Sequence, residues 1–106
     1  MEISKQDWIL FKSKIADWQE AYMEKLCNSY IELLKENKSP SEKFWQLEKR
    51  IRNDKKSCGV QIELRKQDLP LDLVSLIYDG VITLDDIKIF SDDLQDAVRT
   101  FIRLQN

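Results

Sequence analysis

Residues 4–36 read SKQDWILFKSKIADWQEAYMEKLCNSYIELLKE, and this stretch decides the fold. It contains neither glycine nor proline. Its large apolar residues recur three or four positions apart, which is the spacing of one face of an α-helix: Trp8, Phe11, Ile15, Trp18, Tyr22, Leu26, Tyr30 and Leu33. Ser4 is placed to cap the first turn, and Asp7 follows three residues later. We therefore expect a single long helix over about 5–36.

The length of this helix raises a problem of burial. At 1.5 Å per residue it would measure about 48 Å, whereas a compact domain of about 100 residues is only about 30 Å across. One solution is a break at Cys27, Asn28 and Ser29, which are poor helix formers. The other is that something outside the domain covers part of the helix. The sequence leaves both solutions open.

The next segment carries its own start signal. Ser39 fits a helix cap, Pro40 the first helical position and Glu42 the third, so we expect a second helix over about 40–56. After it, apolar and polar residues alternate over 60–64. This alternation is typical of a short extended segment, although the chain offers no second strand to pair with it.

The last third of the chain predicts a helical cluster over about 69–104. Gly80 is expected to end a helix in the left-handed conformation, and Thr83 and Ser91 to cap two further helices. The sequence thus predicts an all-α fold of four to five helices, with a long N-terminal helix, a helical C-terminal cluster and one short extended segment near 60–64. The whole of 1–106 is expected to form a single helical domain.

Charge is sorted along the chain. Residues 1–42 carry six basic and eight acidic side chains. Residues 43–66 carry eight basic and three acidic side chains, and residues 67–106 carry three basic and eight acidic side chains. The formal net charge of −2 therefore hides a basic middle of +5 and an acidic C-terminal third of −5. Either these zones face each other, within one molecule or between two copies, or the basic zone meets an outside polyanion.

Several chemistries are excluded or disfavoured by composition. The chain has no histidine, which removes the usual zinc sites, the common nucleophile–base pairs and the usual general base near neutral pH. Two cysteines, Cys27 and Cys58, are too few for a disulfide scaffold. The N-terminus lacks a secretory pattern and no apolar run reaches 18 residues. We expect no enzyme activity, no cofactor, no metal and no membrane segment.

Aromatic and basic side chains supply the candidate interaction surface. Aromatic residues of the first helix suit either a core or an interface with a partner helix. In the second helix, Trp45 lies among cations, a combination that can follow a phosphate backbone and stack a base. The favoured interpretation buries Phe44 and Trp45 in the core and leaves the cations either solvated or paired with Glu48, Asp54 and the acidic third. The candidate surface comprises Trp8, Phe11, Trp18, Tyr22, Trp45, Lys49, Arg50 and Arg52.

These features favour a small, non-enzymatic protein of the bacterial cytosol that acts as a helical protein–protein interaction or regulatory module. Its first expected partner is a second copy, as a homodimer, because the long helix must bury its stripe. A nucleic-acid-associated accessory factor using the basic segment 43–66 is the less favoured alternative, since the pI near 5.2 is far from that of most nucleic-acid-binding domains. The abundance of lysine and isoleucine suits an AT-rich bacterial genome.

Overall fold

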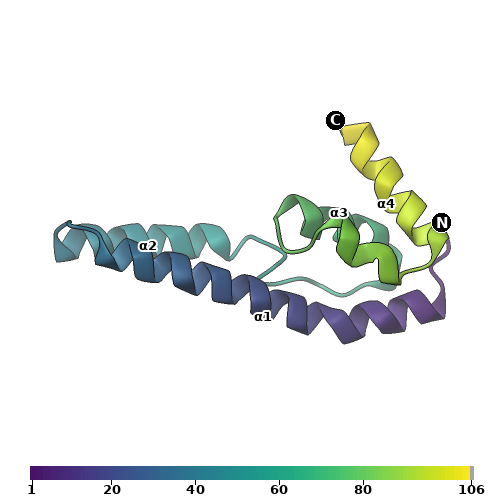
Figure 1. Ribbon diagram of the computed structural model, residues 1–106, viewed down its shortest axis with the longest axis horizontal. Coiled ribbons are helices and arrows are strands. Elements are labelled where there is room, and N and C mark those ends of the chain that lie inside the picture. The colour runs from purple at the N-terminus through teal and green to yellow at the C-terminus, as the bar shows by residue number, and fades with distance from the viewer. Residues whose placement is uncertain (106) are drawn as a thin grey trace.

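The computed structural model describes residues 1–105, and its helices agree with the predicted fold class (Figure 1). The α-helices are α1 (Lys5–Lys35), α2 (Pro40–Asp54), α3 (Leu69–Tyr78) and α4 (Asp92–Gln105). Two 3-10 helices, η1 (Lys66–Asp68) and η2 (Leu84–Ile89), flank α3. No β-strand occurs within residues 1–105, so the all-α prediction is confirmed.

The first helix runs without a break. The Ser4 side chain accepts a hydrogen bond from the Asp7 backbone N–H at 3.0 Å, as its position predicts. At the expected weak point, the Ser29 hydroxyl donates to the Leu26 carbonyl at 2.7 Å, so its polar group is satisfied inside the helix. The molecule is consequently elongated, with a longest extent of 53 Å. Its radius of gyration is 16.6 Å, whereas a compact chain of 100 residues has a radius of gyration of about 13 Å.

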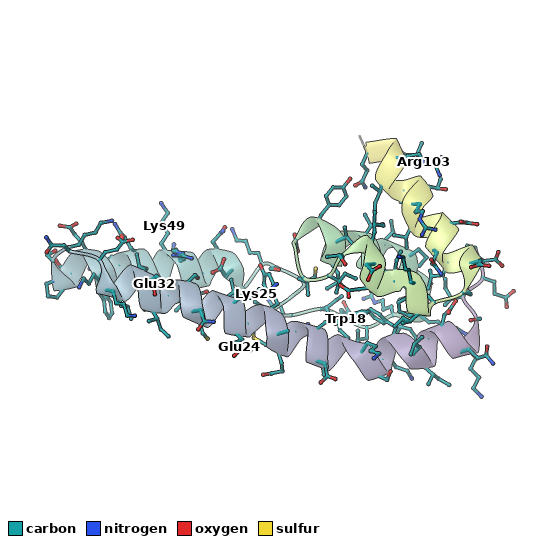
Figure 2. All side chains as sticks on the ribbon, in the orientation of Figure 1. Trp18, Glu24, Lys25, Glu32, Lys49 and Arg103 are labelled. Carbon is teal, nitrogen blue, oxygen red and sulfur yellow. The ribbon has the colours of Figure 1, made fainter. Side chains whose placement is uncertain are left out.

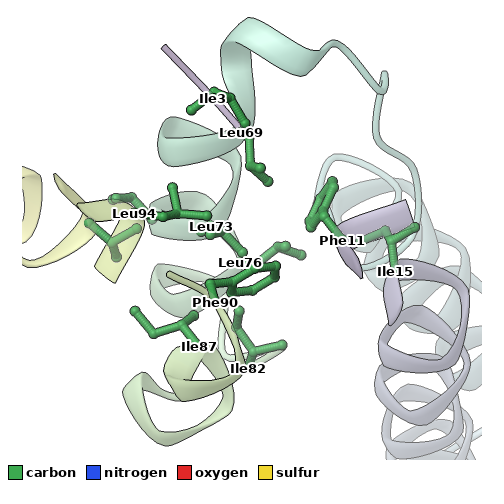
Figure 3. Close-up of a cluster of buried hydrophobic side chains, with 12 residues drawn as sticks. Ile3, Phe11, Ile15, Leu69, Leu73, Leu76, Ile82, Ile87, Phe90 and Leu94 are labelled. Atoms are coloured by element: carbon green, nitrogen blue, oxygen red, sulfur yellow. The ribbon is translucent and has the colours of Figure 1, made fainter. Parts of the chain in front are cut away.

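The hydrophobic core lies at one end of the molecule, in a part that we call the head: residues 3–18 of the N-terminal region with 69–105 (Figure 1). Phe11 and Ile15 of α1 face Leu73 and Leu76 of α3 across this core (Figure 3). The other buried members are Ile3, Leu69, Val74, Ile82, Ile87, Phe90, Leu94 and Val98.

A polar contact fixes the two ends of the chain to each other. The buried carboxylate of Asp7 accepts hydrogen bonds from the Ser91 backbone N–H at 3.0 Å and from the Ser91 hydroxyl at 2.5 Å. The Ser91 hydroxyl also accepts from the Leu94 N–H at 3.3 Å, which confirms Ser91 as the cap of α4. One serine therefore joins the starts of α1 and α4.

The predicted turn signals of the C-terminal cluster are also present. Gly80 has a φ of 76°, the left-handed value expected at the end of α3. The Val81 N–H reaches back to the Leu76 carbonyl at 2.9 Å. Thr83 forms a capping box, in which its own backbone N–H donates to the Asp86 carboxylate at 2.8 Å.

The opposite end of the molecule is a two-helix arm, residues 19–54, in which α2 lies antiparallel to the C-terminal half of α1 (Figure 1). Tyr30 donates to the Asp54 carboxylate at 2.5 Å, and Arg50 donates to the Ser29 hydroxyl at 2.8 Å. Leu33 is the sole buried residue of α1 within the arm, and none of α2 is buried. The arm therefore has almost no core of its own.

Residues 55–65, the strap, return the chain from the arm to the head along α1 (Figure 1). The second helix ends at Asp54, two residues before the predicted end, and a turn follows. The expected extended segment at 60–64 forms no strand. Its apolar residue Ile62 packs against the head core, and Gln19 of α1 donates to the Cys58 carbonyl at 3.0 Å. The strap is therefore held by contacts with α1 and the head core rather than by pairing with another strand.

Gly59 marks the tightest point of the strap. A Cβ atom at this position would stand 2.4 Å from Cδ2 of Tyr22 and 2.6 Å from Cγ2 of Val81. We expect Gly59→Ala to lower the free energy of unfolding by about 1–3 kcal/mol, the usual effect of overpacking. Urea denaturation followed by circular dichroism measures this loss. In the Tyr22→Ala, Val81→Ala double variant the added methyl group has space. If Gly59→Ala lowered the free energy of unfolding by the same amount in that variant, the steric explanation would be contradicted.

Candidate interaction surface

The predicted aromatic residues of α1 differ in how deeply they are buried. Phe11 is 0% exposed and belongs to the core. Trp8 and Trp18 are half-buried and pack against that core, with the Trp18 ring 6.4 Å from the ring of Phe90. Tyr22 is half-buried under the strap at Gly59. The structure therefore uses these four side chains to hold the head and the strap together.

The aromatic residues of α2, in contrast, are exposed to solvent. Phe44 is 63% exposed and Trp45 is 64% exposed, and their rings meet edge to face with centroids 5.0 Å apart. The interpretation that places both in the core is wrong, because the arm has no layer of side chains outside α2 to cover them. They lie on exposed surface near the tip of the arm.

Helical geometry gives α2 three different faces. Successive residues point about 100° apart, so Arg50 and Asp54, which contact α1, define the inner face. To one side of it lie Phe44, Leu47 and Ile51. The outer face, turned away from α1, carries Trp45 and basic side chains. Lys49 projects from this side in Figure 2.

We call the apolar side of the arm the flank. It consists of Phe44, Leu47 and Ile51 of α2 and Met23, Cys27, Tyr30 and Leu34 of α1. One hollow of about 320 Å³ lies along α2 between Phe44 and Lys55. A second, of about 250 Å³, lies between α1 and α2. Ile51 and Lys55 line both hollows, so the two form one continuous apolar strip along the arm.

We call the remaining surface of α2 the basic face. Trp45, Lys49 and Arg52 follow each other in α2 at steps of four and three residues, and therefore project on one side. Lys56 belongs to the strap just beyond the helix and is included because it lines the same hollow as Lys49 and Arg52. All four are exposed. A wide hollow of about 660 Å³ adjoins them and is lined by Gln46, Lys49, Arg50, Arg52, Asn53, Asp54 and Lys56. Of the predicted cations, only Arg50 turns inward, where its guanidinium lies 5.4 Å from the Tyr30 ring centroid.

The basic segment is not neutralised by the acidic third of the same molecule. Arg52 pairs with Glu48 and Arg65 with Glu63, both within segment 43–66. Among residues 1–105, no ion pair joins this segment to residues 67–105. Within one chain the two zones therefore meet without an ion pair, where Asp68 lies near Arg65 and Asp79 shares a hollow with Lys56. The match of the two zones between copies stays a prediction.

Perturbed titratable groups gather where the strap meets α3. The Cys58 thiol lies 3.1 Å from the Asp79 carboxylate, and burial followed by this contact raises the pKa of Cys58 to about 12. Asp72 is half-buried, and one of its oxygens has no hydrogen-bond partner among the described residues. Burial, with a smaller contribution from Asp68, raises the pKa of Asp72 to about 6.

These groups do not form a metal site. Within residues 1–105, no three histidine, cysteine or acidic side chains are arranged to hold a metal ion. None of the helices described combines the length and the apolar character needed to cross a bilayer. The hollows of the arm are open and have apolar and basic linings.

Comparison with known proteins gives no relative. No protein-family model, no curated protein and no solved structure matches this chain.

Sequence reasoning missed most of the flank. Phe44, Leu47 and Ile51 were recognisable as an apolar face, but Met23, Cys27 and Leu34 lie outside the stripe of α1 that the spacing emphasises. A second apolar line at 23, 27, 30 and 34, with steps of four, three and four, was the available signal.

The two cysteines should differ sharply in reactivity. Cys27 is exposed on the flank, whereas the thiol of Cys58 has its pKa raised to about 12 and stays protonated at neutral pH. We expect a maleimide to add once to the folded, dilute protein and twice in denaturant, as measured by intact mass. Cys58→Ser should leave the folded adduct unchanged. Two adducts formed at equal rates on the folded chain would contradict this assignment.

Asp72 should make stability depend on pH. A pKa raised from 3.8 to about 6 means that the folded state holds this proton more tightly than the unfolded state. The stabilisation is complete below about pH 4 and is lost as pH rises through 6. Asp72→Asn should therefore unfold like wild type at pH 4 but at higher urea concentration at pH 7. Asp17→Asn, an exposed substitution on α1, is the control, and equal shifts in both variants would refute the prediction.

Proposed function

We propose that this protein is a small, non-enzymatic interaction module of the bacterial cytosol, and that it self-associates as a homodimer through the flank of its arm. The observation that carries the proposal is the arm itself. It extends α1 beyond the head core, and of its own apolar side chains only Leu33 is buried, while Leu34 and Phe44 are exposed and the others of the flank, Cys27 apart, are half-buried. Contiguous apolar surface of this kind usually marks an interaction site.

The flank suits a second copy in shape. Two antiparallel helices with one open apolar side form half of a four-helix bundle, and a second arm would supply the other half. In a two-fold dimer the same patch is used twice, so the patch must be complementary to itself. Continuous hollows along Ile51 and Lys55 provide space for the side chains of a facing helix.

The charges beside the flank fit this arrangement. Glu48 of α2 and Lys55, the residue that caps its C-terminal end, border the apolar hollow about two turns apart. When two α2 helices lie antiparallel, their sequence directions oppose, so Glu48 of one copy can face Lys55 or Arg52 of the other. Opposite charges at the rim of an interface guide association and fix its register more than they add affinity. A parallel arrangement would place like charges together.

The decisive experiment is sedimentation equilibrium of wild type and two matched variants. We expect wild type to sediment at twice 12.6 kDa at micromolar concentration. Ile51→Glu buries a charge in the proposed interface and should yield the monomer. Ile31→Glu makes the same chemical change on an exposed residue of α1 outside the flank, and should remain dimeric.

Two further readouts separate dissociation from unfolding. Far-ultraviolet circular dichroism should show the same helix content in the Ile51→Glu monomer. Alkylation of Cys27, which lies on the flank, should slow in wild type as protein concentration rises, and should be independent of concentration in Ile51→Glu. A wild-type monomer of 12.6 kDa at about 100 µM, a concentration at which dimers with a micromolar Kd are populated, would overturn the proposal.

A further inference from the structure

We propose that the basic face of α2 binds single-stranded nucleic acid, with Lys49, Arg52 and Lys56 along the phosphodiester backbone and Trp45 stacked on an unpaired base. This inference does not depend on self-association, because Trp45, Lys49 and Lys56 lie away from the flank. Among the residues of the basic face, Arg52 alone also borders the flank hollow. It reverses the preference that the sequence supports, on the strength of two structural observations.

The first observation is the exposure of Trp45. The other two tryptophans are half-buried against the head core, whereas Trp45 is 64% exposed at the tip of the arm. Its ring is held in place by edge-to-face contact with Phe44. An exposed, oriented indole offers a flat surface for a nucleobase. Stacking of this kind accepts any base but requires one that is unpaired, which indicates a single strand.

The second observation is the line of cations that follows Trp45. Lys49 and Arg52 lie on successive turns of α2, and Lys56 lies just beyond the helix and lines the same hollow, so three cations can meet the phosphates of one strand. Glu48 neutralises part of Arg52, while Lys49 and Lys56 have no ion-pair partner within residues 1–105. Asn53 lies on the same side and lines the adjoining hollow, where its amide can donate to a phosphate oxygen.

The low overall pI does not oppose such binding, because the charges are separated in space. The acidic third belongs to the head, and the basic face belongs to the arm, along a molecule 53 Å long. At physiological ionic strength, electrostatic interactions between exposed charges are screened over about 8 Å. Asp79, which shares a small hollow with Lys56, marks where the basic face ends. The positive charge is local to the basic face, because residues 19–54 as a whole carry seven basic and seven acidic side chains.

An acidic protein surface is the competing partner, including the acidic third of a second copy. Such a surface would pair with the same cations but would not stack on the indole of Trp45. Trp45 therefore distinguishes the two classes: its removal weakens binding of a single strand and leaves a purely charge-driven protein contact nearly unchanged. Nucleic acid is favoured because the structure presents the indole and the cations on one side.

The test is fluorescence anisotropy with a labelled 20-nucleotide oligo(dT), its duplex form and polyglutamate as probes, at about 50–200 mM salt. We expect oligo(dT) to bind more tightly than either other probe. Lys49→Gln, Lys56→Gln removes two cations that lie away from the flank and should lower the slope of log affinity against log salt by about 1.4. Trp45→Ala should weaken oligo(dT) binding about 5- to 100-fold, the range for losing one stacked base.

Lys5→Gln, Lys14→Gln is the matched control, since it removes two exposed cations from α1 in the head and should leave affinity nearly unchanged. Sedimentation of every variant separates this test from self-association. Equal binding of polyglutamate, insensitive to Trp45→Ala, would assign the face to an acidic protein and overturn the proposal. Absence of oligo(dT) binding at 50 mM salt, or equal losses in the control, would overturn it as well.

Discussion

The structure depends on one constraint: α1 is a single helix of 31 residues, and the head can cover only its first half. Phe11 and Ile15 anchor that half in the core, where burial supplies most of the stabilisation. The second half must continue into solvent because nothing in its sequence ends the helix before Lys35. An arm, a returning strap and exposed apolar surface are direct consequences of this mismatch.

The arm is held by few interactions, and their nature limits its stability. Burial and the bond to Asp54 raise the pKa of Tyr30 to about 12, so the phenol keeps the proton that it donates across the contact between α1 and α2. The other charged contacts of the arm are exposed, and each is worth at most about 1 kcal/mol. With Leu33 as its sole buried apolar residue, the arm gains stability from anything that covers its flank.

Local signals were predictable from the sequence, whereas the coverage of each face was not. Ser4, Gly80 and Ser91 act as predicted because caps and left-handed turns depend on neighbouring residues. The alternation at 60–64 was misleading, because a strand also requires a second strand to pair with. Ile62 packs against the head core instead. Periodicity likewise identified the apolar residue Phe44 but could not say that no layer would cover it. Tertiary partners are a property of the whole chain.

The proposed roles of the arm follow from how α2 divides its 15 residues. Its inner face is committed to α1, its apolar side is open, and its outer face is basic. These sides are separated by rotation about one helix axis, so covering the flank leaves Trp45 and Lys49 accessible. A dimer formed through the flank would carry two basic faces on one rigid bundle. Linked sites of this kind bind a long strand more tightly than either alone, because the second contact becomes intramolecular. Self-association would thereby strengthen the weaker, salt-sensitive interaction rather than compete with it.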